Sequence, residues 1–293
     1  MTVNKQKVLD GYATNLYFCI MTDFRPGGFQ QLPTVVKNLL IINVLVFALR
    51  YTLGMRGIDL DNYLGLHYWQ SPLFHWWQLF THLFMHGSVA HIFFNMFALW
   101  MFGRILENVW GPKRFLIFYI ICGLGAALCH LGVLTFEYTR FHNAYMYYQE
   151  HPTFVEYAQF IRHEHLTDNP VFNNILSFWN ANPMCSNCAQ TSIDAINIHY
   201  KGMMDEATVG ASGAIMGVLF AFGYLFPNTL LYLYFAIPVK AKWFVAGYAA
   251  VELFMGFQNS ADDNVAHFAH LGGMLFAFIL LRIWNNKISN RSY

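Results

Sequence analysis

Charged residues are scarce in this sequence: Asp, Glu, Lys and Arg make up 11% of its 293 residues, whereas soluble domains carry about a quarter. Hydrophobic residues make up 56%, and the mean hydropathy is +0.35. This composition argues against an ordinary soluble domain and indicates a membrane protein. A net charge of +1 and the lack of a basic stripe argue against nucleic acid as a partner.

The sequence contains few cysteines and no long apolar run near its first residues. Five cysteines are too few for a disulfide scaffold. The first 19 residues hold no long apolar run behind their lysines, so we expect no cleavable signal peptide. The first membrane segment is then expected to direct insertion. The sequence also lacks an internal repeat, which a transporter built from inverted repeats would show.

Long apolar segments, by contrast, are present. A helix needs about 20 mostly apolar residues to cross a bilayer. The run at 230–237 lies between two prolines and is too short to span, so we interpret it as a re-entrant or interfacial connection. Six stretches qualify as spans: 34–54, 89–107, 112–135, 209–226, 241–257 and 264–284. The sequence therefore predicts an all-α membrane protein, a bundle of six transmembrane helices.

The distribution of Lys and Arg predicts the orientation of these helices. With the N-terminus inside, the inner segments hold 12 Lys and Arg and the outer segments hold five, in agreement with the positive-inside rule. Both termini are then cytoplasmic. The expected parts are a cytoplasmic segment 1–33, helices 1 to 3 in 34–135, a polar, acidic outer insert 136–208, helices 4 to 6 in 209–285, and a cytoplasmic tail 286–293.

Polar side chains inside apolar spans are costly and are therefore candidates for function. His91 and Asn95 lie four residues apart near the start of the second span, so they share a helix face. Ser212 opens the fourth span, and His267 and His270 open the sixth. These three spans all run from outside to inside. Their polar groups are therefore expected at one depth, a little below the outer surface.

A serine and a histidine at one depth can act as nucleophile and base. The imidazole of His270 would take the proton of the Ser212 hydroxyl and later pass it to the leaving amine. Attack on a carbonyl creates an oxyanion, and the amide of Asn95 and a ring N–H of His91 could donate to it. The pattern therefore favours hydrolysis of an amide bond within the membrane.

Glycines around Ser212 fit this chemistry. Gly210 lets the backbone approach closely, with no side chain in the way. Gly213 and Gly217 give the fourth span a small face, and Gly273 and Ala277 give the sixth span a matching one. Close contact between these two spans would bring the histidine to the serine.

Five segments of the sequence resemble motifs of the rhomboid family of intramembrane serine proteases. They are WWQLFTHLFMHGSVAHIFFN (76–95), GRILENVWG (103–111), GASGAIMG (210–217), IPVKAKW (237–243) and AHFAHLGG (266–273). The resemblance covers about residues 34–285 apart from the outer insert, and it implies the six-helix rhomboid fold. It also implies that Ser212 is the nucleophile, His270 the general base, and His91 and Asn95 oxyanion donors.

The resemblance further implies the partners and the location. Rhomboid proteases cleave transmembrane helices of other proteins near the outer face and use no metal or cofactor. The expected partners are the lipid bilayer and single-pass or multi-pass membrane-protein substrates, which would enter between spans 2 and 5. The frame of six spans without a seventh resembles bacterial-type members, so we expect the bacterial cytoplasmic membrane.

The sequence departs from the family pattern in three places. Gln78 stands where relatives usually carry Arg, so a hydrogen-bond network in the outer loop 51–88 is expected to differ. Met216 stands where relatives often have an aromatic ring stacked on the histidine, and the insert 136–208 is larger than in the simplest members. None of these changes removes a catalytic group, so we expect an active enzyme. The alternative is a non-catalytic rhomboid-like protein that binds client transmembrane helices.

Simpler roles for single residues stay open at this point. Ser212 could be a helix N-cap, His270 a hydrogen-bonded core histidine, and His91 and Asn95 polar contacts between helices. His82 and His86 have the spacing of metal ligands but lack a third ligand. We interpret this pair as loop packing, with His86 lining the cavity.

Three interpretations of Cys185 and Cys188 stay open. A local disulfide is favoured over a zinc site, and free thiols are the third possibility. Such a zinc site would need insert histidines such as His163, His165 or His199 as further ligands. Cys122 and Cys129 lie in the third span and are expected to be packing residues.

Overall fold

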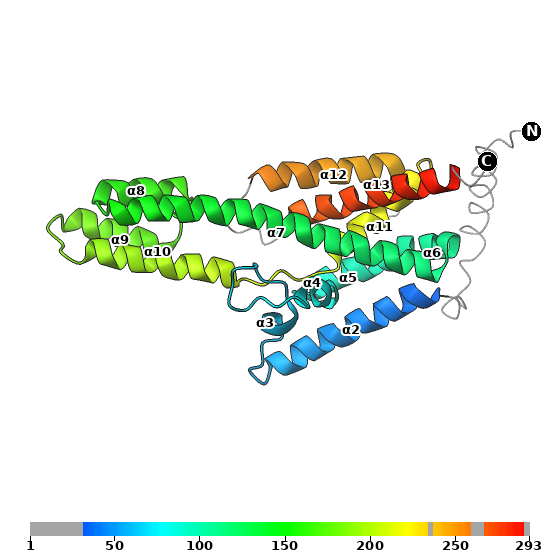
Figure 1. The fold of residues 1–293 in the computed structure, drawn as a ribbon, viewed down its shortest axis with the longest axis horizontal. Coiled ribbons are helices and arrows are strands. Elements are labelled where there is room, and N and C mark those ends of the chain that lie inside the picture. The colour runs from blue at the N-terminus through cyan, green and yellow to red at the C-terminus, as the bar shows by residue number, and fades with distance from the viewer. Residues whose placement is uncertain (1–31, 234–236, 259–266, 290–293) are drawn as a thin grey trace, which may run out of the picture.

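The computed structural model describes residues 32–233, 237–258 and 267–289, and these are mostly helical. Most of the expected segment 1–33, the end of the tail 286–293 and the start of the sixth expected span lie outside the described residues. Figure 1 shows the elements in chain order. They are α2 (Thr34–Gly54), α3 (Asp61–Leu64), α4 (Gln78–Thr81), η2 (His82–Phe84), α5 (Val89–Ala98), η3 (Leu99–Gly103), α6 (Arg104–Trp110), α7 (Pro112–Glu150), α8 (Phe154–His163), α9 (Pro170–Ala181), α10 (Cys188–Asp205), α11 (Ser212–Leu225), β1 (Leu230–Leu233), β2 (Ile237–Lys240), α12 (Ala241–Gln258) and α13 (His267–Ser289).

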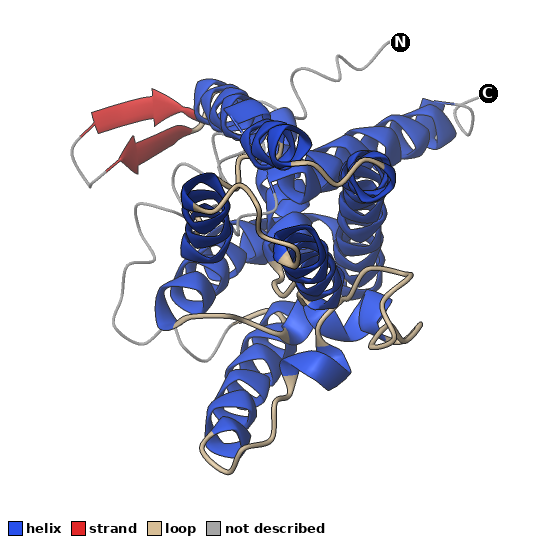
Figure 2. Cartoon of the chain, turned by 90° about the vertical axis from the view of Figure 1, so that its left-hand side faces the viewer, coloured by secondary structure: helices blue, strands red, loops and turns tan. Residues whose placement is uncertain are grey.

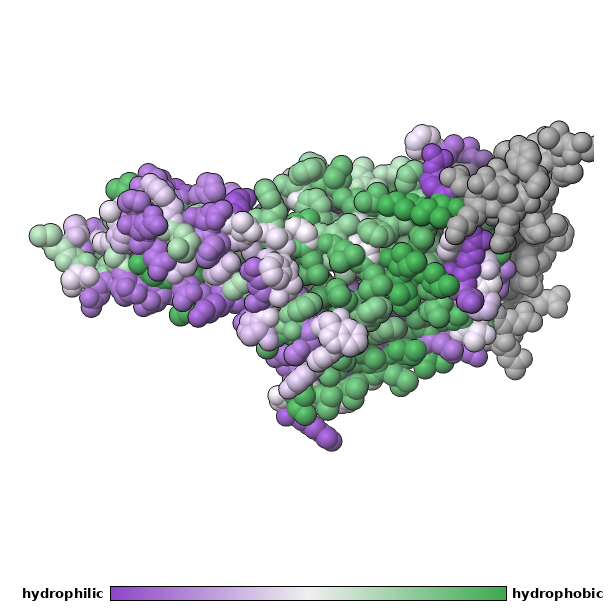
Figure 3. Space-filling model, viewed as in Figure 1, coloured by the Kyte–Doolittle hydropathy of each residue, from purple (hydrophilic) through white to green (hydrophobic). Residues whose placement is uncertain are grey.

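Helices occupy the described part of each of the six predicted spans, so the protein is an all-α membrane bundle, and the described residues add one small hairpin. Among the described residues, four helical segments are long and apolar enough to cross a membrane by length and composition. They are Thr34–Gly54, Val89–Trp110 (α5, η3 and α6 in succession), Pro112–Glu150 and His267–Asn285. Figure 3 shows an apolar surface over this bundle, with polar surface on the insert at one end and more at the other.

The fourth and fifth expected spans correspond to α11 and α12, which do not meet that criterion. α11 has 14 residues, and ten of them are buried because α7, α12 and α13 pack around it. A helix enclosed by other helices makes little contact with lipid, so its own length need not match the apolar thickness of the bilayer. α12 is less apolar because it carries Lys242 and Glu252.

α7 is longer than the predicted third span. It starts after Gly111, whose φ of 78° breaks the preceding helix, and Pro112 occupies its first turn. The prediction ended this helix at residue 135, where polar residues begin, but the helix continues to Glu150. Residues 136–150 contain no Pro or Gly that would end it, and Pro152 follows two residues after its last residue. The expected boundary between membrane part and insert therefore falls within one helix.

The insert is a small helical unit with its own core. The end of α7 packs with α8, α9 and α10 and projects away from the membrane bundle (Figure 1). Its core is rich in aromatic side chains, including Tyr148, Tyr157 and Phe172. A disulfide joins Cys185 to Cys188, the first residue of α10, as the sequence predicted. These sulfurs are thus not thiolate ligands for zinc.

The described residues of the run at 230–237 belong to two paired strands, so the re-entrant interpretation is wrong, while the interfacial one stays a prediction. Residues 234–236 lie outside the described residues. β1 and β2 pair antiparallel, with Leu230 opposite Lys240 and Leu233 opposite Ile237. Figure 2 shows the two strands projecting from the side of the helices. The two prolines that flank the run prevent a continuous helix there, and the hairpin connects α11 to α12.

Glycines bring α11 and α13 into close contact, as the sequence predicted. A Cβ placed on Gly273 would lie 1.9 Å from the carbonyl oxygen of Gly213. A Cβ on Gly217 would lie 3.2 Å from the carbonyl oxygen of Gly273 and 2.7 Å from Cys122 of α7. The small face of α11 therefore packs against both α13 and α7. These contacts determine how the first turns of α11 and α13 pack together.

Glu107 joins α6 to the start of α2. Its buried carboxylate accepts hydrogen bonds from the backbone N–H groups of Val35 (2.9 Å) and Val36 (2.8 Å). These donors belong to the first turn of a helix, where no intrahelical acceptor exists. Glu107→Gln leaves one acceptor oxygen and places an NH2 group against a second donor. We expect the free energy of unfolding to fall by about 1–3 kcal/mol in detergent, and by less than about 0.5 kcal/mol in the exposed control Glu150→Gln.

Candidate active site

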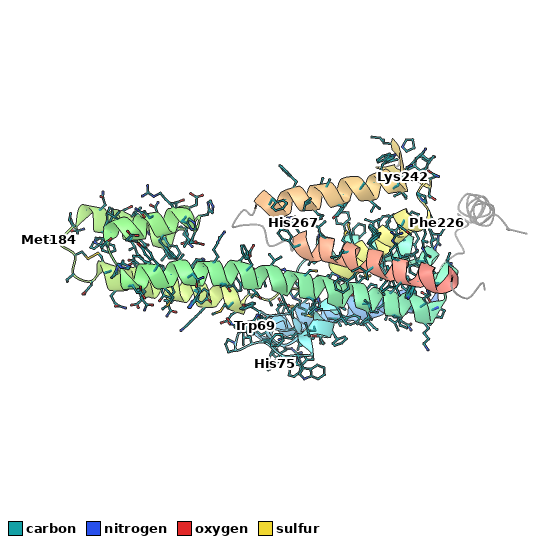
Figure 4. The ribbon with its side chains drawn as sticks, turned by 45° about the horizontal axis from the view of Figure 1, so that its top comes forward. Trp69, His75, Met184, Phe226, Lys242 and His267 are labelled. Atoms are coloured by element: carbon teal, nitrogen blue, oxygen red, sulfur yellow. A yellow bond between two sulfur atoms is a disulfide. The ribbon has the colours of Figure 1, made fainter. Side chains whose placement is uncertain are left out.

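The membrane bundle contains a cavity of about 1600 Å³. It lies among α5, α7, α11, α12 and α13 and is mostly apolar, with polar groups from the first turns of several helices. All four predicted site residues line it: His91, Asn95, Ser212 and His270. Ser212 is the first residue of α11, His91 the third of α5 and His270 the fourth of α13. Figure 4 shows His267 at this end of α13, with Lys242 at the opposite end of the bundle.

Ser212 does not cap its helix. The N-cap is Ala211, and no side chain makes a capping hydrogen bond there. The interpretation of Ser212 as an N-cap is therefore wrong, because its hydroxyl makes no bond to the helix start. This frees the hydroxyl for the cavity.

Gly210 holds the backbone against the site. Its φ of 142° lies in a region that favours glycine, and its N–H donates to the carbonyl of His82 at 3.0 Å. A Cβ on Gly210 would lie 2.8 Å from the His91 ring and 3.4 Å from the Ser212 hydroxyl oxygen. The imidazole and the hydroxyl therefore flank this glycine on the cavity side.

Asn95 carries a hydrogen-bond donor that the protein does not use. The residue is 5% exposed, and its Nδ2 has no hydrogen-bond partner among the described residues. The helix that carries it begins at a defined point because the Ser88 hydroxyl accepts from the backbone N–H of His91 at 3.1 Å. A buried NH2 without a partner costs free energy, so a cavity ligand with an acceptor atom would relieve that cost.

His270 is buried and contacts a carboxylate that sequence reasoning missed. Its Nδ1 lies 3.0 Å from Oε2 of Glu252 on α12, and Nδ1 of His267 lies 2.7 Å from the same oxygen. Glu252 is itself 5% exposed. An ionisable residue in the expected fifth span was the signal that could have found it. No hydrogen bond joins Ser212 to His270 in the part of the chain that the structure describes, although both line the cavity.

The loop 51–88 is cross-linked by the side chain of Gln78, the residue that departs from the family pattern. Its side chain is fully buried and bonds four backbone groups. Oε1 accepts from the N–H of His75 (3.0 Å) and of His67 (3.4 Å), while Nε2 donates to the carbonyls of Leu73 (2.9 Å) and Asn62 (3.4 Å). The neutral side-chain amide of Gln78 thus makes the hydrogen-bond network of this loop, at a position where relatives usually carry a charged Arg.

The two loop histidines exchange their expected places. His82 lines the cavity, whereas His86 is fully buried and does not. The prediction that His86 lines the cavity is wrong, because its ring packs behind His91 with ring centroids 5.1 Å apart. Burial lowers the pKa of each of these two histidines to about 4, so both are neutral at physiological pH. Nδ1 of neutral His82 then donates to the Gln78 carbonyl at 2.7 Å.

Residues 73–139 and 172–286 match the family model of the Rhomboid domain. Two relatives match over most of the chain. They are an uncharacterised mitochondrial rhomboid protein of Schizosaccharomyces pombe, 25% identical over 89% of the chain and 68% of its own length, and the mitochondrial RHOMBOID-like protein 12 of Arabidopsis thaliana, 25% identical over 84% and 56%.

A third relative matches over a shorter segment. The rhomboid protease GluP of Bacillus subtilis is 38% identical over 18% of the chain and 10% of its own length. The chain thus spans about half of the Arabidopsis protein and a tenth of the Bacillus protein.

Proposed function

The chain belongs to the rhomboid family, and on this premise we propose that it is an intramembrane serine endopeptidase. Its substrates are other membrane proteins, cleaved in or near their transmembrane segments. The observation that carries the proposal is one cavity, inside an apolar bundle, lined by the Ser212 hydroxyl, the His270 imidazole and the unpaired amide of Asn95. These are the groups that acyl transfer requires.

The reaction follows from these groups. The Ser212 oxygen attacks the carbonyl carbon of the scissile peptide bond, and His270 takes the hydroxyl proton through Nε2. His270 then gives this proton to the leaving amine, and the C–N bond breaks to leave an ester on Ser212. Water, activated by the same imidazole, hydrolyses the ester and restores the serine. The Asn95 amide, a ring N–H of His91 and the Ser212 backbone N–H stabilise the oxyanion in both steps.

Substrate access is proposed between α5 and α12. The cavity is lined on one side by Phe93 and Phe97 of α5 and on the other by Phe244, Tyr248 and Met255 of α12. These apolar side chains suit a transmembrane helix that enters from the lipid. The second and fifth spans were the pair expected from the family resemblance.

The protein is an integral membrane protein, and we propose that both termini are cytoplasmic. This orientation rests on the excess of Lys and Arg in the inner segments and places the insert and the site at the outer end. We propose a bacterial cytoplasmic membrane from the frame of six spans. A mitochondrial membrane is the competing location, because two relatives that match most of the chain are mitochondrial proteins.

The function is tested by cleavage in proteoliposomes. Purified wild-type protein and Ser212→Ala are reconstituted with several tagged single-span substrates in the presence of EDTA, and products are mapped by mass spectrometry. We expect the wild type alone to cut, in or beside the transmembrane segment. If no substrate is cut but both proteins retain the substrates in pull-down, the chain is a non-catalytic binder of transmembrane helices.

Asn95→Ala tests the oxyanion site. Loss of one hydrogen-bond donor to the transition state is expected to lower kcat by about 100-fold. KM should change little, because this donor binds the oxyanion more strongly than it binds the carbonyl of the bound substrate. The matched control is Asn43→Ala, since Asn43 is also buried in a spanning helix but bonds the Leu39 carbonyl within its own helix. Equal kcat values in the two variants would remove Asn95 from the mechanism.

A further inference from the structure

Glu252 is a buried carboxylate without a role in the mechanism so far. It lies on α12, within a largely apolar helix, and is 5% exposed. A buried carboxylate is costly unless polar partners compensate it. Its partners are two imidazoles of α13, at 2.7 Å (His267 Nδ1) and 3.0 Å (His270 Nδ1). The hydroxyl of Tyr248, on the same helix, is a third partner of this carboxylate.

The contact with His270 defines which ring nitrogen serves Ser212. A carboxylate attracts the N–H of an imidazole, so a proton is favoured on Nδ1 of His270. The lone pair is then on Nε2, the nitrogen that must act as base. The 3.0 Å contact lies at an angle outside hydrogen bonding, while His267 makes the hydrogen bond. The carboxylate is therefore in place, and a small rotation of either group would align it with His270.

We propose that Glu252 is a positioning residue that completes a Ser212–His270–Glu252 triad. This inference rests on the proposed serine protease function and adds a third member to it. Glu252 would hold His270 in the tautomer with a free Nε2 and would stabilise the imidazolium that forms when Ser212 loses its proton. His267 shares the carboxylate and holds it between α12 and α13.

The same three side chains are of types that could hold a metal ion. Their atoms, however, already touch one another at 2.7 and 3.0 Å, distances that fit direct contact between a carboxylate oxygen and imidazole N–H groups. A triad and a metal site also differ in their response to chelators. Cleavage by the triad persists in EDTA.

The surroundings of His270 make Glu252 its main source of negative charge. The titratable groups that face His270 are Glu252 from α12, His267 from its own helix, His91 from α5 and His130 from α7. Glu137 of α7 lines the same cavity. Because the other facing groups are imidazoles, removal of the Glu252 charge should be visible in the pH dependence of cleavage.

The test compares Glu252→Gln and Glu252→Asp with wild type in proteoliposomes, by kcat and KM across pH 5–9. We expect Glu252→Gln to lose about 100-fold or more in kcat with KM nearly unchanged, since an amide cannot stabilise the imidazolium. The acid limb of its kcat/KM profile moves to lower pH, because protonated His270 loses its counter-charge. Glu252→Asp keeps the charge and should retain kcat within about tenfold of wild type.

Glu107→Gln is the matched control, since it makes the same change at an equally buried carboxylate outside the cavity. It should lower stability without moving the pH profile. The triad would be overturned if Glu252→Gln had the wild-type kcat. It would also be overturned if the Gln and Asp variants lost equal activity with an unshifted acid limb, and in both cases the proposed protease function would still stand. Absence of cleavage by the wild type would instead refute the proposed function, and activity abolished by EDTA would replace the triad with a metal site.

Discussion

Replacing Ser212 with alanine is expected to reduce kcat/KM for substrate cleavage by at least about 1000-fold, and His270→Ala should cost nearly as much. The two residues act as one unit, since Ser212 is a weak nucleophile without a base, and His270 has no hydroxyl proton to accept without Ser212. The double variant should therefore lose little more than either single one. Initial rates in proteoliposomes, with thermal unfolding recorded for each variant, measure this.

Two variants of the same residue types control for general damage. Ser177→Ala and His151→Ala alter exposed positions in the insert region and should cleave at the wild-type rate. Losses in the two single variants that multiply in the double variant would mean that Ser212 and His270 act independently. That result would contradict a nucleophile and base pair.

Gly273→Ala is expected to be the most damaging substitution away from the polar groups. The added Cβ would lie 1.9 Å from the carbonyl oxygen of Gly213, so α11 and α13 must separate. Overpacking of this kind costs about 3 kcal/mol, and it moves the helix that carries His270 away from the helix that carries Ser212. We expect a matching fall in the free energy of unfolding and the loss of most cleavage activity.

Gly247→Ala is the matched control for that variant. A Cβ on Gly247 of α12 would meet nothing within 4 Å, and alanine is the better helix former by about 0.5–1 kcal/mol. Unfolding of both variants in the same detergent separates the contact from general helix propensity. Similar stability of the two variants would show that α11 and α13 do not depend on a close backbone contact.

Much of the site could be predicted because polar residues in apolar spans are few. Span direction placed His91, Ser212 and His270 at one end of the bundle, and the structure has them lining one cavity. The glycine faces predicted the α11–α13 contact, because small residues on both helices let the two backbones approach closely. These inferences needed only periodicity and the direction of each span.

Other features depend on contacts that the sequence pattern does not contain. Glu252 precedes His270 by 18 residues, and only the packing of α12 against α13 brings the two together. The end of α7 at Glu150 was missed because hydropathy marks where a helix becomes polar, not where its backbone ends. His82 rather than His86 reaches the cavity because the η2 turn sets which ring faces inward.

Covalent labelling with a fluorophosphonate probe tests whether this cavity holds an activated serine. Detergent-solubilised wild type, Ser212→Ala and His270→Ala are incubated with the probe, and the labelled peptide is identified by mass spectrometry. We expect one adduct, on Ser212, that is absent from Ser212→Ala and forms far more slowly in His270→Ala. Equal labelling of all three proteins, or an adduct on another residue, would contradict it.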